Sequence, residues 1–306
     1  MRLELTQAAD FLRRNTPEAI GEAIGLLQST VYSFSMKVCG HPEDAEDTTQ
    51  EVLFRSLNHL AKIQDPQALA VWLYTVTKNR CWRMRRKTSH AAKHLSLDEL
   101  MPDEAELGRL LQDAAESPEG VLLHAEQDHL IHQAVLRIPA QLRIVLVLCD
   151  MEELTTEQVA QVLNLQPGTV RVRLHRARLT VRKEMNKLLD VPPKKAKICN
   201  RTKKKSKGIP AHIEQRSAEC RELFSNLSEY LDGRVEPKTC EAMRGHIEAC
   251  PTCIAFLQKL RTAIDQCRSL AIPCDPAVSL RLRAILTKEY LRLLGMTSIE
   301  PPRGEP

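Results

Sequence analysis

The residues best suited to chemistry lie near the C-terminus, in the stretch HIEACPTC that begins at His246. His246 and Cys250 are four residues apart, so a helix would place them on one face, and Cys250 and Cys253 form a CxxC pair. Imidazole and thiolate are the ligands of tetrahedral zinc sites, which need a fourth ligand. Cys220 and Cys240 are the candidates for it. The spacing predicts a zinc site, with metal-free buried cysteines as the alternative.

The remaining thiols and the apolar runs bear on the compartment. Cys240, Cys267 and Cys274 are additional thiols near the cluster, so a redox-sensitive zinc site is an alternative to a purely structural one. The start MRLELTQAADFLRR lacks the apolar core of a signal peptide, and the longest apolar run, IVLVLC, is far shorter than the roughly 20 residues that span a bilayer. We therefore expect a cytoplasmic protein with no membrane contact.

The same cluster argues against catalysis. Three soft ligands and a fourth would close the metal site, and neither paired carboxylates nor a nucleophile and base stand out near it. A hydrolytic enzyme is thus the weakest of the function classes weighed. We expect that the protein is not an enzyme.

The elements that position these residues are expected to be helices. In 306 residues only 4% are aromatic, and leucine, alanine and valine recur at helical spacing. This length favours two or three units. The fold class predicted is all-α.

The middle of the chain predicts a helix-turn-helix in the stretch LTTEQVAQVLNLQPGTVRVRLHRARLTVRKEM. Thr155 or Thr156 can cap a short helix, a turn follows at 164–168, and a second helix starts at Thr169. The second helix carries seven basic residues, namely Arg171, Arg173, Arg176, Arg178, Arg182, Lys183 and Lys187. This geometry suits insertion into a DNA major groove, and a merely solvated basic helix is the alternative.

An earlier helix mixes aromatic and basic residues, in the stretch QALAVWLYTVTKNRCWRMRRK from Gln67. Flat rings on which bases can stack, polar groups and cations together suit an opened DNA duplex. Core packing is the alternative for the aromatics, above all for Trp72. Its basic end closes the first unit near Lys87.

Two charged stretches separate the units. Residues 98–119 hold eight acidic residues and the single base Arg109, whereas residues 192–208 hold eight Lys or Arg and no acid. Neither has sustained apolar periodicity, so both are predicted to be linkers.

These motifs, in this order, resemble a known family. HPEDAEDTTQEVLFRSLNHLAKI followed by AVWLYTVTKNRCWRMRRK resembles region 2 of bacterial σ70-family sigma factors of the extracytoplasmic-function (ECF) group, and residues 121–187 resemble region 4. CRELFSNLSEYLDGRVEP followed by HxxxCxxC resembles the zinc-binding anti-sigma domain. In that pattern a cysteine opens the first helix, which favours Cys220 over Cys240 as the fourth ligand.

The resemblance implies roles for particular residues. DNA would be contacted by Trp72, Lys78, Asn79, Arg80, Arg83, Arg85 and Arg86, among which Asn79 and Arg80 are better placed for the −10 element. The −35 element would be contacted by Pro167, Gly168, Thr169, Arg171, Val172, Arg173, His175, Arg176 and Arg178. Core RNA polymerase would bind at Asp44, Asp47, Gln50 and Glu51. Structural zinc would be held by Cys220, His246, Cys250 and Cys253.

The predicted organisation has six parts: a region 2-like domain at 1–88, an acidic linker at 89–120, a region 4-like domain at 121–190, a basic linker at 191–211, a zinc-binding anti-sigma-like domain at 212–272 and a C-terminal tail at 273–306. The function predicted is promoter recognition with core RNA polymerase, regulated by intramolecular contact with the zinc domain. A zinc-dependent helix-turn-helix repressor and a sequestering adaptor without promoter activity are the alternatives.

Overall fold

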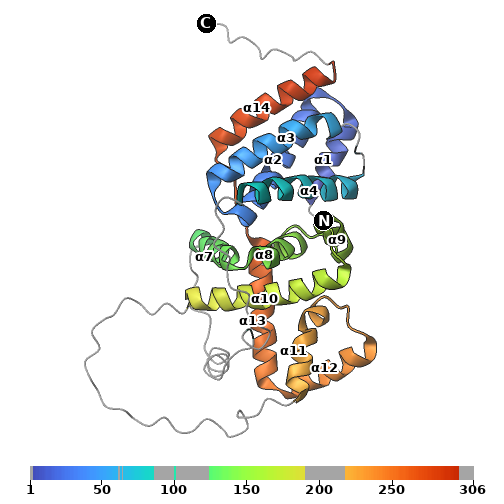
Figure 1. Ribbon diagram of the computed structural model, residues 1–306, viewed down its shortest axis with the longest axis vertical. Helices are drawn as coiled ribbons and strands as arrows, with labels where there is room; N and C mark the ends of the chain where they lie inside the picture. Colours follow the sequence, from blue (N-terminus) through green and yellow to red (C-terminus); the bar gives the residue numbers. More distant parts are fainter. Residues whose placement is uncertain are drawn as a thin grey trace, which may run out of the picture. The chain divides into compact units, whose positions relative to one another are not determined.

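The computed structural model describes residues 3–60, 63, 65–85, 100, 124–189 and 218–295, and within them every regular element is a helix (Figure 1). The predicted all-α class is confirmed. Among these helices none is long and apolar enough to cross a membrane. The chain forms two compact units: the first consists of residues 1–92, 139–170 and 269–306, and the second of residues 93–138 and 171–268.

The first unit begins with four helices, each explained by its start and end signals. They are α1 (Leu3–Arg14), α2 (Pro17–Cys39), α3 (Pro42–Leu60) and α4 (Pro66–Arg85). Thr16 caps α2 by accepting a hydrogen bond from the Ala19 amide, and Gly40 ends it in the left-handed conformation at φ 87°. Proline opens α2, α3 and α4, where its fixed φ suits a first helical turn. The helices pack around buried apolar side chains such as Leu27, Phe34 and Leu73.

The middle of the chain supplies elements to both units. They are α7 (His124–Arg137), α8 (Ala140–Leu146), a five-residue π-helix η1 (Val147–Met151), α9 (Thr156–Leu163) and α10 (Pro167–Leu189). Thr155 caps α9 in a reciprocal capping box with Gln158, and Asn164 ends it at φ 53°. The short helix, the turn and the long basic helix therefore form in the predicted order, but α10 starts at Pro167, before the predicted start at Thr169.

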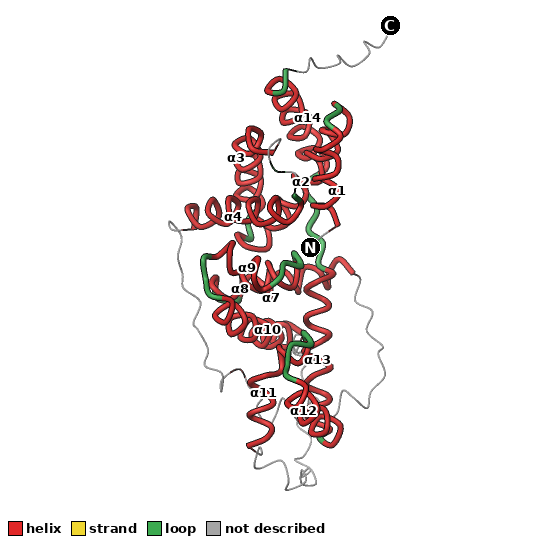
Figure 2. Tube along the Cα trace, turned by 90° about the vertical axis from the view of Figure 1, so that its right-hand side faces the viewer, coloured by secondary structure: helices red, strands yellow, loops and turns green. Residues whose placement is uncertain are grey.

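The second unit is completed by three helices, α11 (Ala218–Leu231), α12 (Pro237–Ala249) and α13 (Pro251–Ser269). Figure 2 shows all three as helices, in red. Leu223, Phe224, Leu227, Phe256 and Leu260 are buried in one apolar cluster. The cluster also contains Leu179 of α10 and Leu100, which is the described residue of the predicted acidic linker. The second half of α10 thus shares a core with the zinc domain.

The stretch assigned from sequence to a tail contains a further helix, α14 (Pro276–Leu293). Asp275 caps it through the amides of Ala277 and Val278, and Pro276 occupies its first turn. α14 packs on α2 and α3 within the first unit (Figure 1). The C-terminal segment is therefore docked on the region 2-like helices.

Glycines on α2 allow α14 to approach closely. A Cβ at Gly25 would lie 3.1 Å from the guanidinium carbon of Arg283. The Arg283 Nε donates to the Gly21 carbonyl at 2.9 Å and its Nη2 pairs with Glu22 at 2.6 Å. Further along, the Gln28 side chain donates to the Ser279 carbonyl at 3.2 Å. The glycines of α2 and the hydrogen bond and ion pair of Arg283 on α14 therefore fix this contact.

Replacing Arg283 with alanine is expected to loosen α14. The substitution removes a charge-assisted hydrogen bond and an ion pair, so amide protection of α14 measured by hydrogen–deuterium exchange should fall about tenfold. The matched control is Arg281→Ala, on an exposed side of the same helix. Equal protection in both variants would show that Arg283 does not hold α14.

Candidate DNA-recognition helix and zinc cluster

The predicted DNA-reading residues of α10 divide between exposed and buried positions. Gly168, Thr169, Arg171, Val172 and Arg176 are exposed, whereas His175 and Arg178 are buried. Pro167 and Arg173 are intermediate. The helix therefore has one face open to solvent and one face covered.

The covered face of α10 packs against α11 of the zinc domain and the turn that follows α11. Arg178 forms a bidentate ion pair with Asp232. The carboxylate oxygens of Asp232 lie 2.9 and 3.0 Å from Nη2 and Nη1 of Arg178. The Arg178 side chain is only 2% exposed. One turn earlier, His175 Nδ1 lies 3.0 Å from the Ser228 hydroxyl. Two residues predicted to contact DNA are thus occupied by Ser228 of α11 and by Asp232 in the turn directly after that helix.

Two further contacts extend this interface along α10. Arg171 Nε lies 3.7 Å from Glu229, in an exposed and therefore weak ion pair. At the other end, the guanidinium of buried Arg182 stacks over the Phe256 ring at 4.3 Å from its centroid. The contact therefore runs over about three turns of α10.

Burial changes the protonation of the histidine in this interface. Desolvation, with smaller contributions from the charges of Arg178 and Arg176, lowers the pKa of His175 from 6.5 to about 4. The imidazole is therefore neutral in the closed contact at neutral pH. Protonation would place a third cation beside two guanidinium groups.

The zinc-type ligands are brought together as the spacing predicts. The ligand atoms of His246, Cys250 and Cys253 all lie within 4.8 Å of one another, and His246 Nε2 lies 3.5 Å from Cys253 Sγ. In a tetrahedral site with ordinary zinc–nitrogen and zinc–sulfur bond lengths, two such ligands are about 3.5 Å apart. α12 ends at Cys250 in an extended conformation and α13 starts at Pro251, so the break between helices turns the ligands toward one point. These residues fit zinc; the side chain of Cys220 lies outside the described residues.

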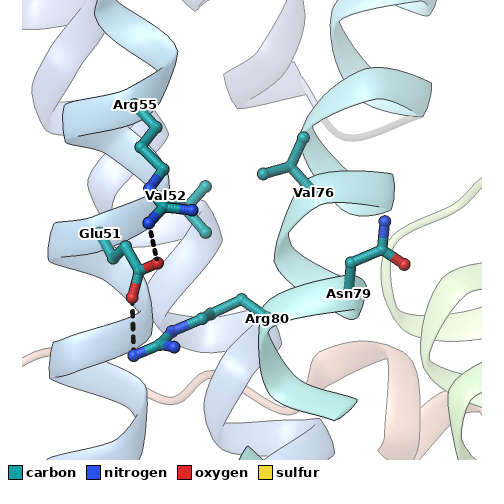
Figure 3. Close-up of a pocket in the computed structure, with 6 residues that line it drawn as sticks. All are labelled: Glu51, Val52, Arg55, Val76, Asn79 and Arg80. Carbon is teal, nitrogen blue, oxygen red and sulfur yellow. Dashed lines mark ion pairs between the residues drawn. The ribbon is translucent and has the colours of Figure 1, made fainter. Parts of the chain in front are cut away.

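Three of the region 2 residues predicted to bind DNA or polymerase, Glu51, Asn79 and Arg80, line a groove between α3 and α4 (Figure 3). Glu51 pairs with Arg80 at 2.6 Å and with Arg55 at 3.0 Å, while Asn79 is exposed and points away from this pair. The predicted polymerase contact Glu51 is therefore tied to the predicted DNA contact Arg80. A change at either residue would disturb the other.

The other region 2 candidates differ in accessibility. Asp47 and Gln50 are exposed and Asp44 is half-buried, so this surface of α3 is open. Trp72 is half-buried with its ring 5.7 Å from that of His59. Lys78 is buried, and desolvation lowers its pKa. The side chains of Arg83, Arg85 and Arg86 lie outside the described residues.

Comparison with known proteins identifies the architecture. The family model "Sigma-70 region 2" matches residues 24–91, "Sigma-70, region 4" matches residues 128–181, and "Putative zinc-finger" matches residues 220–253. The sigma factor YlaC of Bacillus subtilis is 30% identical over 149 residues, which cover 48% of this chain and 80% of YlaC. The ECF sigma factor SigW of the same organism is 25% identical over 191 residues, which cover 61% of this chain and 100% of SigW.

A solved structure is also similar. The sigma factor RpoE in complex with the anti-sigma factor NepR from Bartonella quintana aligns with a TM-score of 0.37 and 20% identity, over 55% of this chain and 94% of that chain.

The chain belongs to the σ70 family of RNA polymerase sigma factors, whose members regulate transcription and are not enzymes. Its relatives include ECF sigma factors, and a zinc-finger domain follows its sigma regions. The predicted family and function class are confirmed. The predicted roles of individual residues remain predictions.

The partners of the buried cations were not predicted from the sequence. Ser228, Glu229 and Asp232 all lie within the stretch CRELFSNLSEYLDGRVEP. The signal was present, since acidic residues at the end of one amphipathic helix complement a basic helix elsewhere in the chain. Nothing in the local pattern paired Asp232 with Arg178, 54 residues away.

The contact between α10 and α11 should weaken as the pH falls from 6.5 toward 4. The pKa of His175 is lower in the closed contact than in free imidazole, so its stabilising effect is complete above pH 6.5 and is lost on acidification. At pH 5 the loss should be about 2 kcal/mol. Amide exchange of α11, corrected for intrinsic rates, measures it.

A His175→Gln variant separates this effect from ligand protonation at the zinc cluster. The amide keeps polar character but does not titrate, so its α11 protection should change less between pH 7 and pH 5. The same pH response in both proteins would assign the weakening to another group.

Proposed function

We propose that this chain is an ECF sigma factor that directs core RNA polymerase to promoters and whose fused zinc domain holds its −35-reading helix closed. The observation that carries the proposal is the burial of Arg178, which pairs with Asp232 directly after α11, and of His175, which contacts Ser228 of α11. A guanidinium already held by a carboxylate does not reach a base or phosphate. DNA binding by this face of α10 therefore requires α11 to leave.

The covalent connection strengthens such a contact. Because α10 and α11 belong to one chain, their association is intramolecular and its strength depends on an effective concentration, not on a separate partner. The negative charges on α11 also occupy positions suited to phosphate. We infer that α11 competes with promoter DNA for the same cations.

Zinc binding at the cluster would stabilise the fold of the inhibitory domain. Helices α11–α13 have only a modest apolar core, which they share with α10, and metal binding is worth about 10 to 16 kcal/mol in zinc-finger peptides. His246, Cys250 and Cys253 would hold structural zinc, with Cys220 as the fourth ligand proposed from the family pattern. Zinc loss, including loss by thiol oxidation, would then loosen the cover over α10.

If Cys220 is the fourth zinc ligand, variants of Cys220 and Cys240 should differ in their zinc content. Cys220→Ser should lose most of its zinc, because three protein ligands hold the metal less tightly than four. Cys240→Ser should retain about one zinc per chain. Metal content of the purified full-length proteins by mass spectrometry decides between them, and the opposite pattern would make Cys240 the fourth ligand.

Reversing the charge of Asp232 should open the recognition helix. In Asp232→Lys an ammonium faces the buried guanidinium of Arg178, so the closed contact is lost and the full chain should bind core RNA polymerase and a random-sequence DNA duplex at least tenfold more tightly. Glu241→Lys adds the same charge at an exposed position of α12 and is the matched control.

Three outcomes are informative. Tighter binding in Asp232→Lys alone supports inhibition by α11. Equal binding of polymerase by wild type and both variants means that the zinc domain does not inhibit at this step. Absence of polymerase binding in all three contradicts the sigma function and favours the repressor.

A further inference from the structure

A second set of buried polar contacts joins the two sigma regions directly, without the zinc domain. The Glu152 carboxylate, just after η1, accepts from Lys37 Nζ of α2 at 2.9 Å and from the Tyr74 hydroxyl of α4 at 2.7 Å. The side chains of Lys37 and Glu152 are both fully buried. All three residues belong to the first unit, in which residues 139–170 of region 4 pack on region 2.

The backbone around Glu152 is shaped for this contact. The Glu152 amide donates to the Val147 carbonyl at 2.9 Å, which closes the π-helical turn, and Glu153 follows in the left-handed conformation at φ 57°. Single π-turns and left-handed non-glycine residues cost energy and are concentrated at functional positions. Here they point one carboxylate at two donors on different helices of region 2.

Two more donors cross between the same segments. Lys78 Nζ of α4 donates to the Val162 carbonyl near the end of α9 at 2.8 Å, and Arg143 Nη1 of α8 donates to the Val38 carbonyl of α2 at 2.8 Å. Both side chains are buried. Lys78 also lies 5.5 Å from the centre of the Trp82 ring. A lysine on the predicted −10-reading helix is therefore held by region 4.

We propose that regions 2 and 4 close on each other through Glu152, and that this closure withdraws Lys78 from the −10-reading surface independently of the zinc domain. The DNA role of Lys78 rests on the proposed function, whereas the closure itself does not. A lysine on an isolated helix keeps its ammonium in water, so the burial of both Lys37 and Lys78 marks a surface made for a partner segment. Promoter binding then requires two releases, one at α10–α11 and one at Glu152.

The closure can be measured by lysine acetylation in the full-length protein. An N-hydroxysuccinimide acetate probe reacts with accessible amines, and peptide mass spectrometry gives a rate for each lysine. In the wild type, Lys37 and Lys78 should react at least tenfold more slowly than exposed Lys238. In Glu152→Lys two ammonium groups would face one another in the buried contact, so both rates should rise at least tenfold.

Matched variants exclude effects of charge and of unfolding. Glu153→Lys makes the same charge change at the neighbouring exposed residue and should leave both rates low. The exchanged pair Lys37→Glu with Glu152→Lys should return Lys78 to a low rate. If circular dichroism shows that Glu152→Lys loses helical structure, Tyr74→Phe replaces it and should raise the two rates about threefold or more, because it removes one hydrogen bond to the carboxylate.

The proposal is overturned if Lys37 and Lys78 react as fast as Lys238 in the wild type. It is also overturned if folded Glu152→Lys or Tyr74→Phe leaves their rates unchanged. Neither DNA nor polymerase enters this assay, so its result is separate from that of the Asp232 variant. Binding of a single-stranded DNA oligonucleotide, stronger in Glu152→Lys than in Glu153→Lys, links the release of Lys78 to DNA.

Discussion

A cation removed from water needs a partner, and this requirement organises the structure around its sigma regions. Among the described residues, five buried lysines and arginines each have one: Lys37 at Glu152, Lys78 at the Val162 carbonyl, Arg143 at the Val38 carbonyl, Arg178 at Asp232, and Arg182 over the Phe256 ring. An unpaired charge at any of these positions would be strongly destabilising. Because Lys78 and Arg178 are also predicted DNA contacts, the groups that suit a polyanion are occupied by the protein itself.

The partners are supplied by two different kinds of segment. Asp232 belongs to the zinc-finger domain that follows the sigma regions and Phe256 belongs to α13, whereas Glu152 and Val162 belong to region 4. The C-terminal α14 adds a third contact, on α2, through Arg283. Within each unit, a later part of the chain covers an earlier one. This order is consistent with a regulatory segment that acts on the domains synthesised before it.

Much of the fold could be predicted from local sequence signals. Prolines at helix starts, Thr155 as a cap and the apolar spacing before the turn at Asn164 are short-range features, and the structure has helices where they indicate. The three zinc-type ligands were likewise predictable, because spacings of four and three residues bring side chains together on or beside one helix. α14 lies in the stretch predicted to be a tail, although Asp275 and Pro276 form an ordinary helix start.

The accessibility of the predicted DNA contacts could not be predicted in the same way. Whether Arg178 is solvated or buried depends on Asp232, and the environment of Lys37 depends on Glu152, 115 residues away. Helical periodicity indicates which residues share a face but not what covers that face. A basic residue on a recognition helix therefore has the same sequence signature in a closed state and in an open one.

The energetics of buried ion pairs suit a reversible closure. Desolvation of a carboxylate and an ammonium largely offsets their attraction, so a pair such as Lys37–Glu152 contributes little net stability while strongly selecting its own partner. A closed state held by such a pair is specific but only weakly stabilised. A competitor that offers many phosphates can therefore replace the contact. A purely apolar interface of similar extent would be harder to open and would expose an aggregation-prone surface once opened. Under the proposed function, polar burial at Glu152 and at Asp232 thus gives the chain two closed contacts that DNA and polymerase would displace.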